Sequence, residues 1–304
     1  MNLGAYALIL AWGVFAALCA WYVATVAGEV TYVTLADGRR QERSIPLIFR
    51  LLLPFVGNLD GMLARPRFEK RLAAANEKLI SAGFEGLLSG KEFVALGLIS
   101  PVVLGAVWCL LIVLLGMMIP DSLFTDGRGF LCVMGILIFA VQPGLWLNGE
   151  VKKRHLAIMK ALPFVLDILT LSVEAGMDFI SALQRNCAVR KMDALNEELL
   201  RMTKEIQVGL SRKEALRNMA ERVKQADLRA VAMALIQADE LGVSIGSILR
   251  IQSEQMRSRR FDRAEKLANE APTKMLGPLM LCIFPAVFII LLGPVLMNAM
   301  KGLM

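Results

Sequence analysis

Four long apolar runs without any Asp, Glu, Lys or Arg alternate with polar segments along the chain. They extend over approximately Leu3–Ala27, Phe93–Ile119, Phe130–Leu147 and Met275–Met300. A helix of about 20 apolar residues crosses a hydrocarbon core roughly 30 Å thick. Each run therefore predicts one transmembrane helix, and the pattern as a whole predicts an all-α membrane protein.

The composition also points to the membrane class. Apolar residues make up 56% of the chain and its mean hydropathy is +0.57, whereas soluble domains have roughly 45–50% apolar residues. The end of the first run, Thr25–Ala27, loosely fits a signal-peptide cleavage site. The positively charged segment that begins a signal peptide is missing, however, so we expect the first run to be a retained transmembrane helix.

Basic residues are concentrated in two of the polar segments. Residues 28–92 contain ten Lys and Arg and residues 150–274 contain 22, whereas the turn at 120–129 contains only Arg128. Because Lys and Arg are retained on the cytoplasmic side, we expect both large segments in the cytoplasm and both termini outside. The predicted transmembrane helices are 1–27, 93–119, 130–148 and 275–300, and the cytoplasmic segments are 28–92 and 150–272.

A short turn pattern recurs three times in the second cytoplasmic segment, at a spacing of 33 residues. A Leu follows each copy at the same offset. The copies are Gly176–Asp178, Gly209–Ser211 and Gly242–Ser244, and the leucines are Leu183, Leu216 and Leu249. Glycine permits the left-handed end of one helix, and Asp or Ser accepts hydrogen bonds from the free amides of the next. Glu214 completes a capping box with Ser211, so the pattern predicts three successive helical hairpins.

Apolar residues between these turns recur with helical periodicity. The predicted helices are Leu156–Ala175, Asp178–Val189, Ala194–Val208, Ser211–Val223, Asp227–Leu241 and Ser244 to about Asn269. Equal spacing also occurs in helical solenoids, which stack identical units and end in capping repeats. Here the last helix is much longer than the others and leads directly into the fourth apolar run. We therefore expect a compact six-helix bundle joined to the membrane.

The first cytoplasmic segment has two parts with different patterns. Ile45–Met62 is apolar but interrupted by polar and helix-breaking residues, and it is expected at the membrane surface or packed on protein. Pro66–Ala82 predicts an amphipathic helix whose basic residues are Arg67, Lys70, Arg71 and Lys78. Such a helix either lies on anionic headgroups or covers a flank of the bundle, and both can hold at once.

The sequence contains no recognisable catalytic or cofactor-binding pattern. It lacks a phosphate-binding Gly-rich loop, a dinucleotide turn and a nucleophile elbow. The single histidine, His155, excludes a pair of histidine metal ligands, and its position after the basic run at the membrane edge disfavours a His-based triad. Four of the five cysteines fall in the apolar runs. Adjacent carboxylates such as Glu197 and Glu198 point about 100° apart on a helix and are expected on solvated faces. We therefore predict no enzyme activity, no metal and no cofactor.

Two further functional classes are disfavoured by charge. Ion and proton pathways usually use ionisable side chains within the membrane, and the four apolar runs contain none. A net charge of +7 would suit nucleic acid, but retention of basic residues on the cytoplasmic side already explains it, so no nucleic-acid partner is expected. A transporter and a membrane-bound sensor or adaptor remain as alternatives.

Three stretches of the chain, taken in order, carry a family resemblance. They are Leu162–Asp167 with Glu174–Gly176, then Gln237–Ser244, then Ala271–Met275 leading into a Pro-rich apolar run. Together they resemble the type II secretion system F domain and, more narrowly, the C-type inner-membrane platform protein of the tight-adherence (Tad, or Flp) pilus. The resemblance implies a non-enzymatic platform in the bacterial inner membrane. Its partners would be a cytoplasmic hexameric secretion ATPase, which it couples to the extraction and polymerisation of pilins, and the lipid bilayer.

This chain has one F-domain copy, whereas classical platform proteins resemble two F domains in one chain. The resemblance therefore implies that a second copy or the related B-type platform protein supplies the other half. Contacts with the ATPase or an adaptor are expected at the turns around Gly176, Gly209 and Gly242, because exposed loops on a rigid scaffold commonly bind partners. The candidate contact residues are Glu174, Asp178, Glu240 and Ser244.

A basic row on the last helix is a second candidate surface, for anionic lipid or an acidic partner. Its candidate residues are Arg257, Arg259, Arg260 and Arg263. Plain structural roles are the alternative at both surfaces: Asp178 and Ser244 are good helix caps, and interleaved acidic residues would make the basic row an ion-paired helix.

Overall fold

The computed structural model describes residues 32–34, 40–42, 45–54, 56, 66–118 and 127–301. Within them, three helices are long and apolar enough to cross a membrane. They are α5 (Gly90–Met118), α7 (Arg128–Glu174) and α12 (Ile245–Lys301), and they contain the second, third and fourth predicted transmembrane runs. The first predicted run and most of the short turn at 120–129 lie outside the described residues, so the count of four transmembrane helices stays a prediction.

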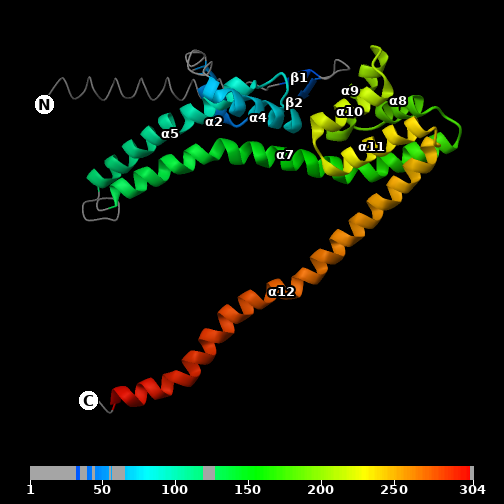
Figure 1. Ribbon diagram of the computed structural model, residues 1–304. Helices are drawn as coiled ribbons and strands as arrows, with labels where there is room; N and C mark the ends of the chain where they lie inside the picture. The colour runs from blue at the N-terminus through cyan, green and yellow to red at the C-terminus, as the bar shows by residue number, and fades with distance from the viewer. Residues whose placement is uncertain are drawn as a thin grey trace, which may run out of the picture.

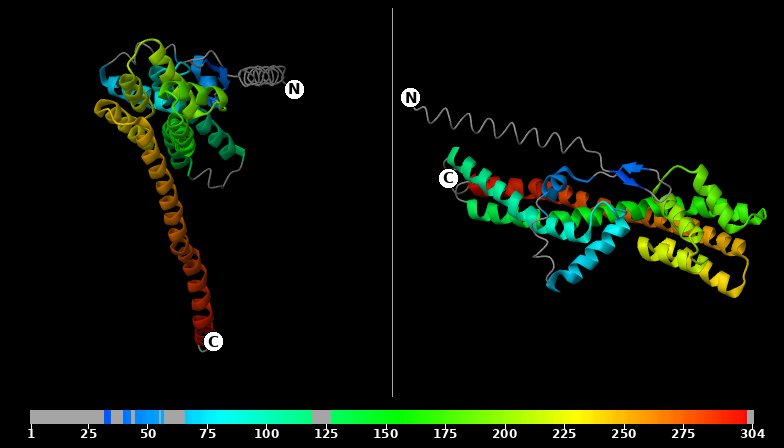
Figure 2. Two further views of the ribbon diagram at one scale, coloured as in Figure 1. Left: turned by 90° about the vertical axis from the view of Figure 1, so that its right-hand side faces the viewer. Right: turned by 90° about the horizontal axis from the view of Figure 1, so that it is seen from above.

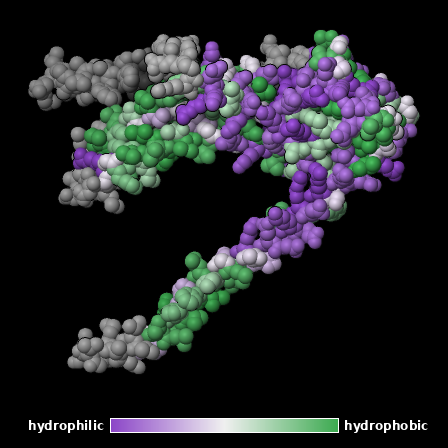
Figure 3. Space-filling view, in the orientation of Figure 1, coloured by the Kyte–Doolittle hydropathy of each residue, from purple (hydrophilic) through white to green (hydrophobic). Residues whose placement is uncertain are grey.

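Apolar and polar parts are separated along the molecule. In Figure 1 the helical bundle lies on the right, while α5, the first half of α7 and the second half of α12 extend to the left. These extensions are the hydrophobic regions of Figure 3, and the bundle with the adjoining part of α12 is mostly hydrophilic. Because the three extensions lie on the same side of the bundle, a single bilayer can hold them all.

Helices α5 and α7 form a hairpin that is closely packed at small residues. A Cβ atom at Gly135 would lie 2.1 Å from Cδ1 of Trp108, and one at Gly105 would lie 2.8 Å from Cγ1 of Ile136. The Trp108 indole donates a hydrogen bond to the Leu131 carbonyl at 3.2 Å. Small residues at helix contacts permit this close approach within a membrane, so these glycines fix how the two spans meet.

Two helices continue without interruption from the apolar region to the far end of the bundle. Helix α7 has 47 residues and α12 has 57, which correspond to about 70 and 85 Å of helix. The first bundle helix was predicted to begin at Leu156, whereas α7 is already helical from Arg128. The charged residues between the two parts favour helix, and Lys153 pairs with Glu150 one turn away, at 2.5 Å. The environment of the helix changes there, but the helix does not end.

The bundle combines the second half of α7, four shorter helices and the first part of α12. The shorter helices are α8 (Phe179–Val189), α9 (Ala194–Gln207), α10 (Arg212–Val223) and α11 (Ala226–Leu241). The ends of these four lie within one residue of the predicted ones, because local caps and turns determine them. The side of the membrane on which the bundle lies stays a prediction.

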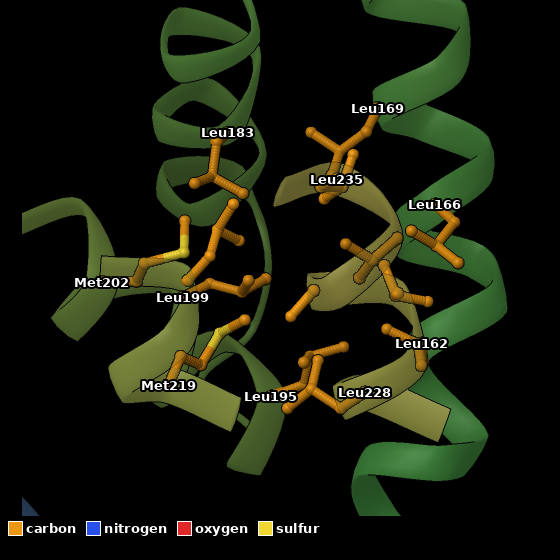
Figure 4. Packing of buried hydrophobic residues seen from close by; sticks show 14 of the residues in the cluster. Leu162, Leu166, Leu169, Leu183, Leu195, Leu199, Met202, Met219, Leu228 and Leu235 are labelled. Atoms are coloured by element: carbon orange, nitrogen blue, oxygen red, sulfur yellow. The ribbon is translucent and has the colours of Figure 1, made fainter. Parts of the chain in front are cut away.

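One hydrophobic core holds the bundle together. Figure 4 shows its leucine and methionine side chains directed toward a common interior from several helices. The leucines that follow the three repeated turns, Leu183, Leu216 and Leu249, are all buried in this core. A gap of about 30 Å³ within it is lined only by apolar side chains, which is far smaller than an ordinary ligand pocket.

A second, smaller core joins the N-terminal elements to the membrane hairpin. Helices α2 (Leu47–Leu52) and α4 (Pro66–Ala82) pack there against α5 and α7. The ring of Trp146 lies 5.1 Å from that of Phe49 and 5.3 Å from that of Phe84. The described part of the segment from Ile45 to Met62 is thus packed on protein, one of its two expected positions.

A short β-hairpin precedes α2 and was not predicted. Strands β1 (Tyr32–Thr34) and β2 (Arg40–Glu42) pair antiparallel, with Tyr32 opposite Glu42. Three residues per strand are too few for an alternating pattern to stand out in the sequence. Apart from these strands, the regular elements of the described residues are helices, in agreement with the predicted class.

Candidate functional site

The three repeated turns have the backbone geometry that their sequence predicts. Gly176, Gly209 and Gly242 have φ angles of +90°, +110° and +65°, in the left-handed region that glycine adopts at helix ends. At each turn the amide of the residue after the glycine donates to the carbonyl five residues earlier, at 3.0–3.1 Å. These bonds close the ends of α7, α9 and α11, so the turns are rigid parts of the fold.

Side chains at two of the turns cap the helix that follows. Asp178 accepts hydrogen bonds from the amides of Ile180 and Ser181 at the start of α8. The predicted capping box is present at α10, where Ser211 and Glu214 satisfy each other's backbone amides. These bonds lower the pKa of the Glu214 carboxyl, chiefly through the Ser211 hydroxyl.

Ion pairs bring the three turns together at one end of the bundle. Arg212, at the start of α10, lies 3.8 Å from Asp178 and 3.5 Å from Asp239 near the end of α11. The next residue, Lys213, pairs with Glu240. We call this end of the bundle, formed by residues 176–178, 208–212 and 239–244, the turn surface.

The turn surface displays apolar residues among its charges. Val208 is 83% exposed and Leu241 is 77% exposed. Single exposed apolar residues are ordinary on protein surfaces, so a docking role depends on the turns that carry these two. The rigid turns beneath them hold these side chains in fixed positions, and this is the arrangement expected of a docking surface on a scaffold.

All four candidate contact residues lie at or beside the turn surface, and three of them also have charged partners. Glu174 lies 3.6 Å from Arg250 at the start of α12. Asp178 combines its capping role with the Arg212 pair. The Lys213 side chain lowers the pKa of the Glu240 carboxyl by hydrogen bonding. The Ser244 carbonyl accepts from the Ser247 hydroxyl at 2.7 Å. Partner binding at these residues stays a prediction.

The basic row on α12 is largely turned toward the bundle. Arg257 pairs with Asp167 of α7 at 2.7 Å, and Arg259 and Arg263 both pair with Asp227 of α11, at 2.8 and 3.1 Å. The two arginines on Asp227 are four residues apart, so they lie one turn apart on the same face of α12. Arg260 has no carboxylate partner among the described residues. The row therefore ties α12 to the bundle, whatever else it contacts.

Replacement of Asp227 by Asn is expected to lower the free energy of unfolding by about 1–3 kcal/mol at neutral pH, because the buried carboxylate accepts charge-assisted hydrogen bonds. Burial opposes its ionisation, but the bonds from Arg263, Arg259 and Gln225 outweigh burial and hold its pKa below the ordinary 3.8. The stabilisation is thus complete above that value and is lost as the pH falls through the folded-state pKa. Pulse proteolysis of the full chain in micelles, along a urea gradient, measures it. If Asp227→Asn lowered the free energy of unfolding by the same amount at neutral pH and below about pH 3.8, the effect would come from packing and not from the carboxylate charge.

A chain of buried ion pairs, which the sequence pattern did not predict, anchors the bundle to α7. Arg154 lies 3.0 Å from Glu197 and 2.7 Å from Glu198 of α9, and its side chain is only 4% exposed. Glu198 in turn pairs with Arg222 of α10 at 3.3 Å, and Arg222 reaches Glu205 at 2.5 Å. The expectation that Glu197 and Glu198 form a solvated face is therefore wrong, since the Glu198 side chain is 6% exposed.

No catalytic or metal-binding arrangement stands beside these surfaces in the part of the chain that the structure describes. No group of three His, Cys, Asp or Glu side chains there is placed to hold a metal ion. His155 Nε2 lies 2.7 Å from the Val223 carbonyl at the end of α10, and burial raises the pKa of the Cys187 thiol to about 11. Both side chains are thus engaged in packing the bundle.

The region that contains the turn surface matches a known protein family. Residues 165–293 match the family model of type II secretion system (T2SS), protein F. This F-domain match begins within α7, includes all three repeated turns and ends in the apolar half of α12. No curated protein and no solved structure matches the chain. The predicted F-domain resemblance is confirmed at this level, and the assignment to the C-type platform protein of the Tad pilus stays a prediction.

Proposed function

We propose that the chain is an inner-membrane platform protein of a Tad/Flp-type pilus or a type II secretion machine. In this role it couples a cytoplasmic hexameric ATPase to the extraction and polymerisation of pilin subunits, and it has no enzyme activity of its own. The F-domain match at residues 165–293 carries the proposal. Because the match covers one F domain, a second copy of the chain or a B-type platform protein completes the platform.

The geometry of α7 and α12 supports a coupling role. Glu174, at the end of α7, lies 25 residues beyond Gly149, and Ile245 lies 30 residues before Met275. At 1.5 Å per residue, the turn surface stands about 40 Å from the apolar halves of both helices. A displacement imposed at the turn surface would reach the membrane through two continuous helices without crossing a flexible loop.

Site-specific photo-crosslinking in native cells tests this function. A photoreactive residue is placed singly at Met177, Leu210 and Val243 of the turn surface, and at Val189 as a control. Val189 is exposed at the other end of α8. We expect the three turn positions, and not Val189, to form adducts with a secretion ATPase or a second F-domain protein. Adducts at Val189 alone, from an inserted and folded chain, would contradict the role assigned to the turn surface.

A further inference from the structure

Helix α4 crosses the membrane hairpin at the level where its apolar runs begin. A Cβ atom at Gly90, the first residue of α5, would lie 2.8 Å from the Leu72 carbonyl oxygen of α4. Lys78 of α4 donates to the Asn148 side chain of α7 at 3.0 Å. Trp146 lies one half-turn before Asn148, and tryptophan is enriched where a bilayer meets water. The crossing therefore marks the boundary between the hydrocarbon region and the bundle.

The C-terminal half of α4 is attached to protein. Its Leu79 side chain is buried in the smaller core. Glu77 pairs with Lys224 of the bundle at 2.7 Å, and Ser81 donates to the Arg222 carbonyl at 3.0 Å. This half covers a flank of the bundle, which was one of the two expected positions for the helix.

The N-terminal half of α4 has a different environment. Seen from above in Figure 2, it runs from the crossing toward the side on which the apolar halves of α5 and α7 extend. Lys70 and Arg71 are exposed there, and neither has a carboxylate partner among the described residues. Phe68 and Leu72 are only partly buried on the neighbouring face. Phe68 also packs against the smaller core, so the apolar face is shared between protein and surroundings. A basic flank beside a partly exposed apolar face, at this level, is the pattern of a helix that lies at a membrane interface.

We propose that the flank of α4 formed by Lys70, Arg71 and Ala74 binds the headgroups of anionic phospholipids. The ammonium and guanidinium groups donate to phosphodiester oxygens, while the partly exposed apolar residues rest against the acyl boundary. The long stems of Lys and Arg allow their charged ends to remain at the headgroups. This proposal is independent of the ATPase and pilin roles, since it requires only that the α5–α7 hairpin is inserted in a bilayer.

Three of the four candidate arginines of α12 are less suited to this role than the basic residues of α4. Arg257, Arg259 and Arg263 already donate to carboxylates of the bundle, so a phosphate would have to displace those partners. Within the described part of the chain, Lys70 and Arg71 have no carboxylate partner to lose and would gain a counter-charge. The lipid contact predicted for a basic helix is therefore assigned to α4.

Photo-crosslinking to lipid tests the proposal on the full chain. A photoreactive residue replaces Ala74, on the basic flank, or Ala73, which is also exposed but points about 100° away. The chain is reconstituted in vesicles of phosphatidylcholine alone or of equal parts phosphatidylcholine and phosphatidylglycerol. We expect Ala74 to form adducts preferentially with phosphatidylglycerol, and Ala73 to form few. The preference should weaken as salt is raised.

The double substitution Lys70→Gln and Arg71→Gln should reduce the phosphatidylglycerol adducts at Ala74 by roughly 25-fold, because each basic residue near an anionic surface contributes roughly fivefold. The matched control is Lys213→Gln with Arg217→Gln, which removes two charges from α10 and should leave the adducts unchanged. Circular dichroism melts verify that both variants fold. Equal adduct yields with the two lipids, no effect of the α4 substitutions, or a protein adduct at Ala74 in native membranes would each overturn the proposal.

Discussion

Replacing Glu198 by Gln is expected to lower the free energy of unfolding of the bundle by about 2–4 kcal/mol. The carboxylate lies between Arg154 and Arg222, at 2.7 and 3.3 Å, and is almost completely buried. Without this carboxylate, Arg154 keeps only Glu197 and Arg222 keeps only Glu205 as carboxylate partners in the described part of the chain, so two buried guanidinium groups lose part of the negative charge that compensates them. Glutamine keeps the size of the side chain, so the loss reports the charge. Pulse proteolysis along a urea gradient, on the full chain in micelles, measures the change.

The control for this prediction is Glu85→Gln, which removes the same kind of charge from an exposed pair. Glu85 forms an ion pair with Arg201, but the two side chains are 46% and 39% exposed. Exposed pairs of this kind contribute at most about 1 kcal/mol. If Glu198→Gln cost no more than Glu85→Gln, the ion-pair chain could not be the anchor between α7 and the bundle.

The sequence predicted the turns and the shorter helices well because their signals are local. A left-handed glycine, a capping residue and a helical apolar stripe all lie within one or two turns of the end that they determine. The buried ion pairs had no such signal. Arg154 meets Glu198 across 44 residues of chain, and only the packed bundle shows that the two face each other.

The continuity of α7 is a second feature that a local pattern did not reveal. The apolar run ends near Leu147 and a charged stretch follows, and a change of this kind resembles a helix end. A helix that leaves a membrane shows the same change without ending, because its backbone hydrogen bonds do not depend on the surrounding solvent. Asn148 and Gly149 also resemble a helix end, and the contrary signal in the sequence is only the absence of Pro between Gly149 and Leu156.

For the candidate surfaces, the sequence located the right regions but could not separate paired from unpaired charges. The turn residues and the α12 arginines were chosen as exposed charged positions. In the structure Glu240 meets Lys213, and Arg257 meets Asp167. Lys70 and Arg71, which the sequence did not distinguish from other basic residues of their helix, lack such partners among the described residues.

The second large effect is expected from Leu249→Ala, which should lower the free energy of unfolding by about 2–5 kcal/mol. Leu249 is fully buried near the start of α12 and borders the apolar gap in the core. Truncation removes its buried methyl groups and enlarges that gap. The lost burial and the larger cavity each lower the stability of the bundle. The matched control is Leu267→Ala on the same helix, where the side chain is 65% exposed and the change should stay within about 0.5 kcal/mol.

The consequence for function follows from the position of Leu249 between the turn surface and the apolar half of α12. If the first turns of α12 detach from the core, a displacement at the turn surface no longer reaches the membrane part of that helix. Leu249→Ala should therefore abolish pilus assembly or secretion at temperatures where inserted chain is still detected, whereas Leu267→Ala should not. Normal assembly in a Leu249→Ala strain that shows the expected loss of stability would mean that coupling passes through α7 alone, and that α12 serves only as a membrane anchor.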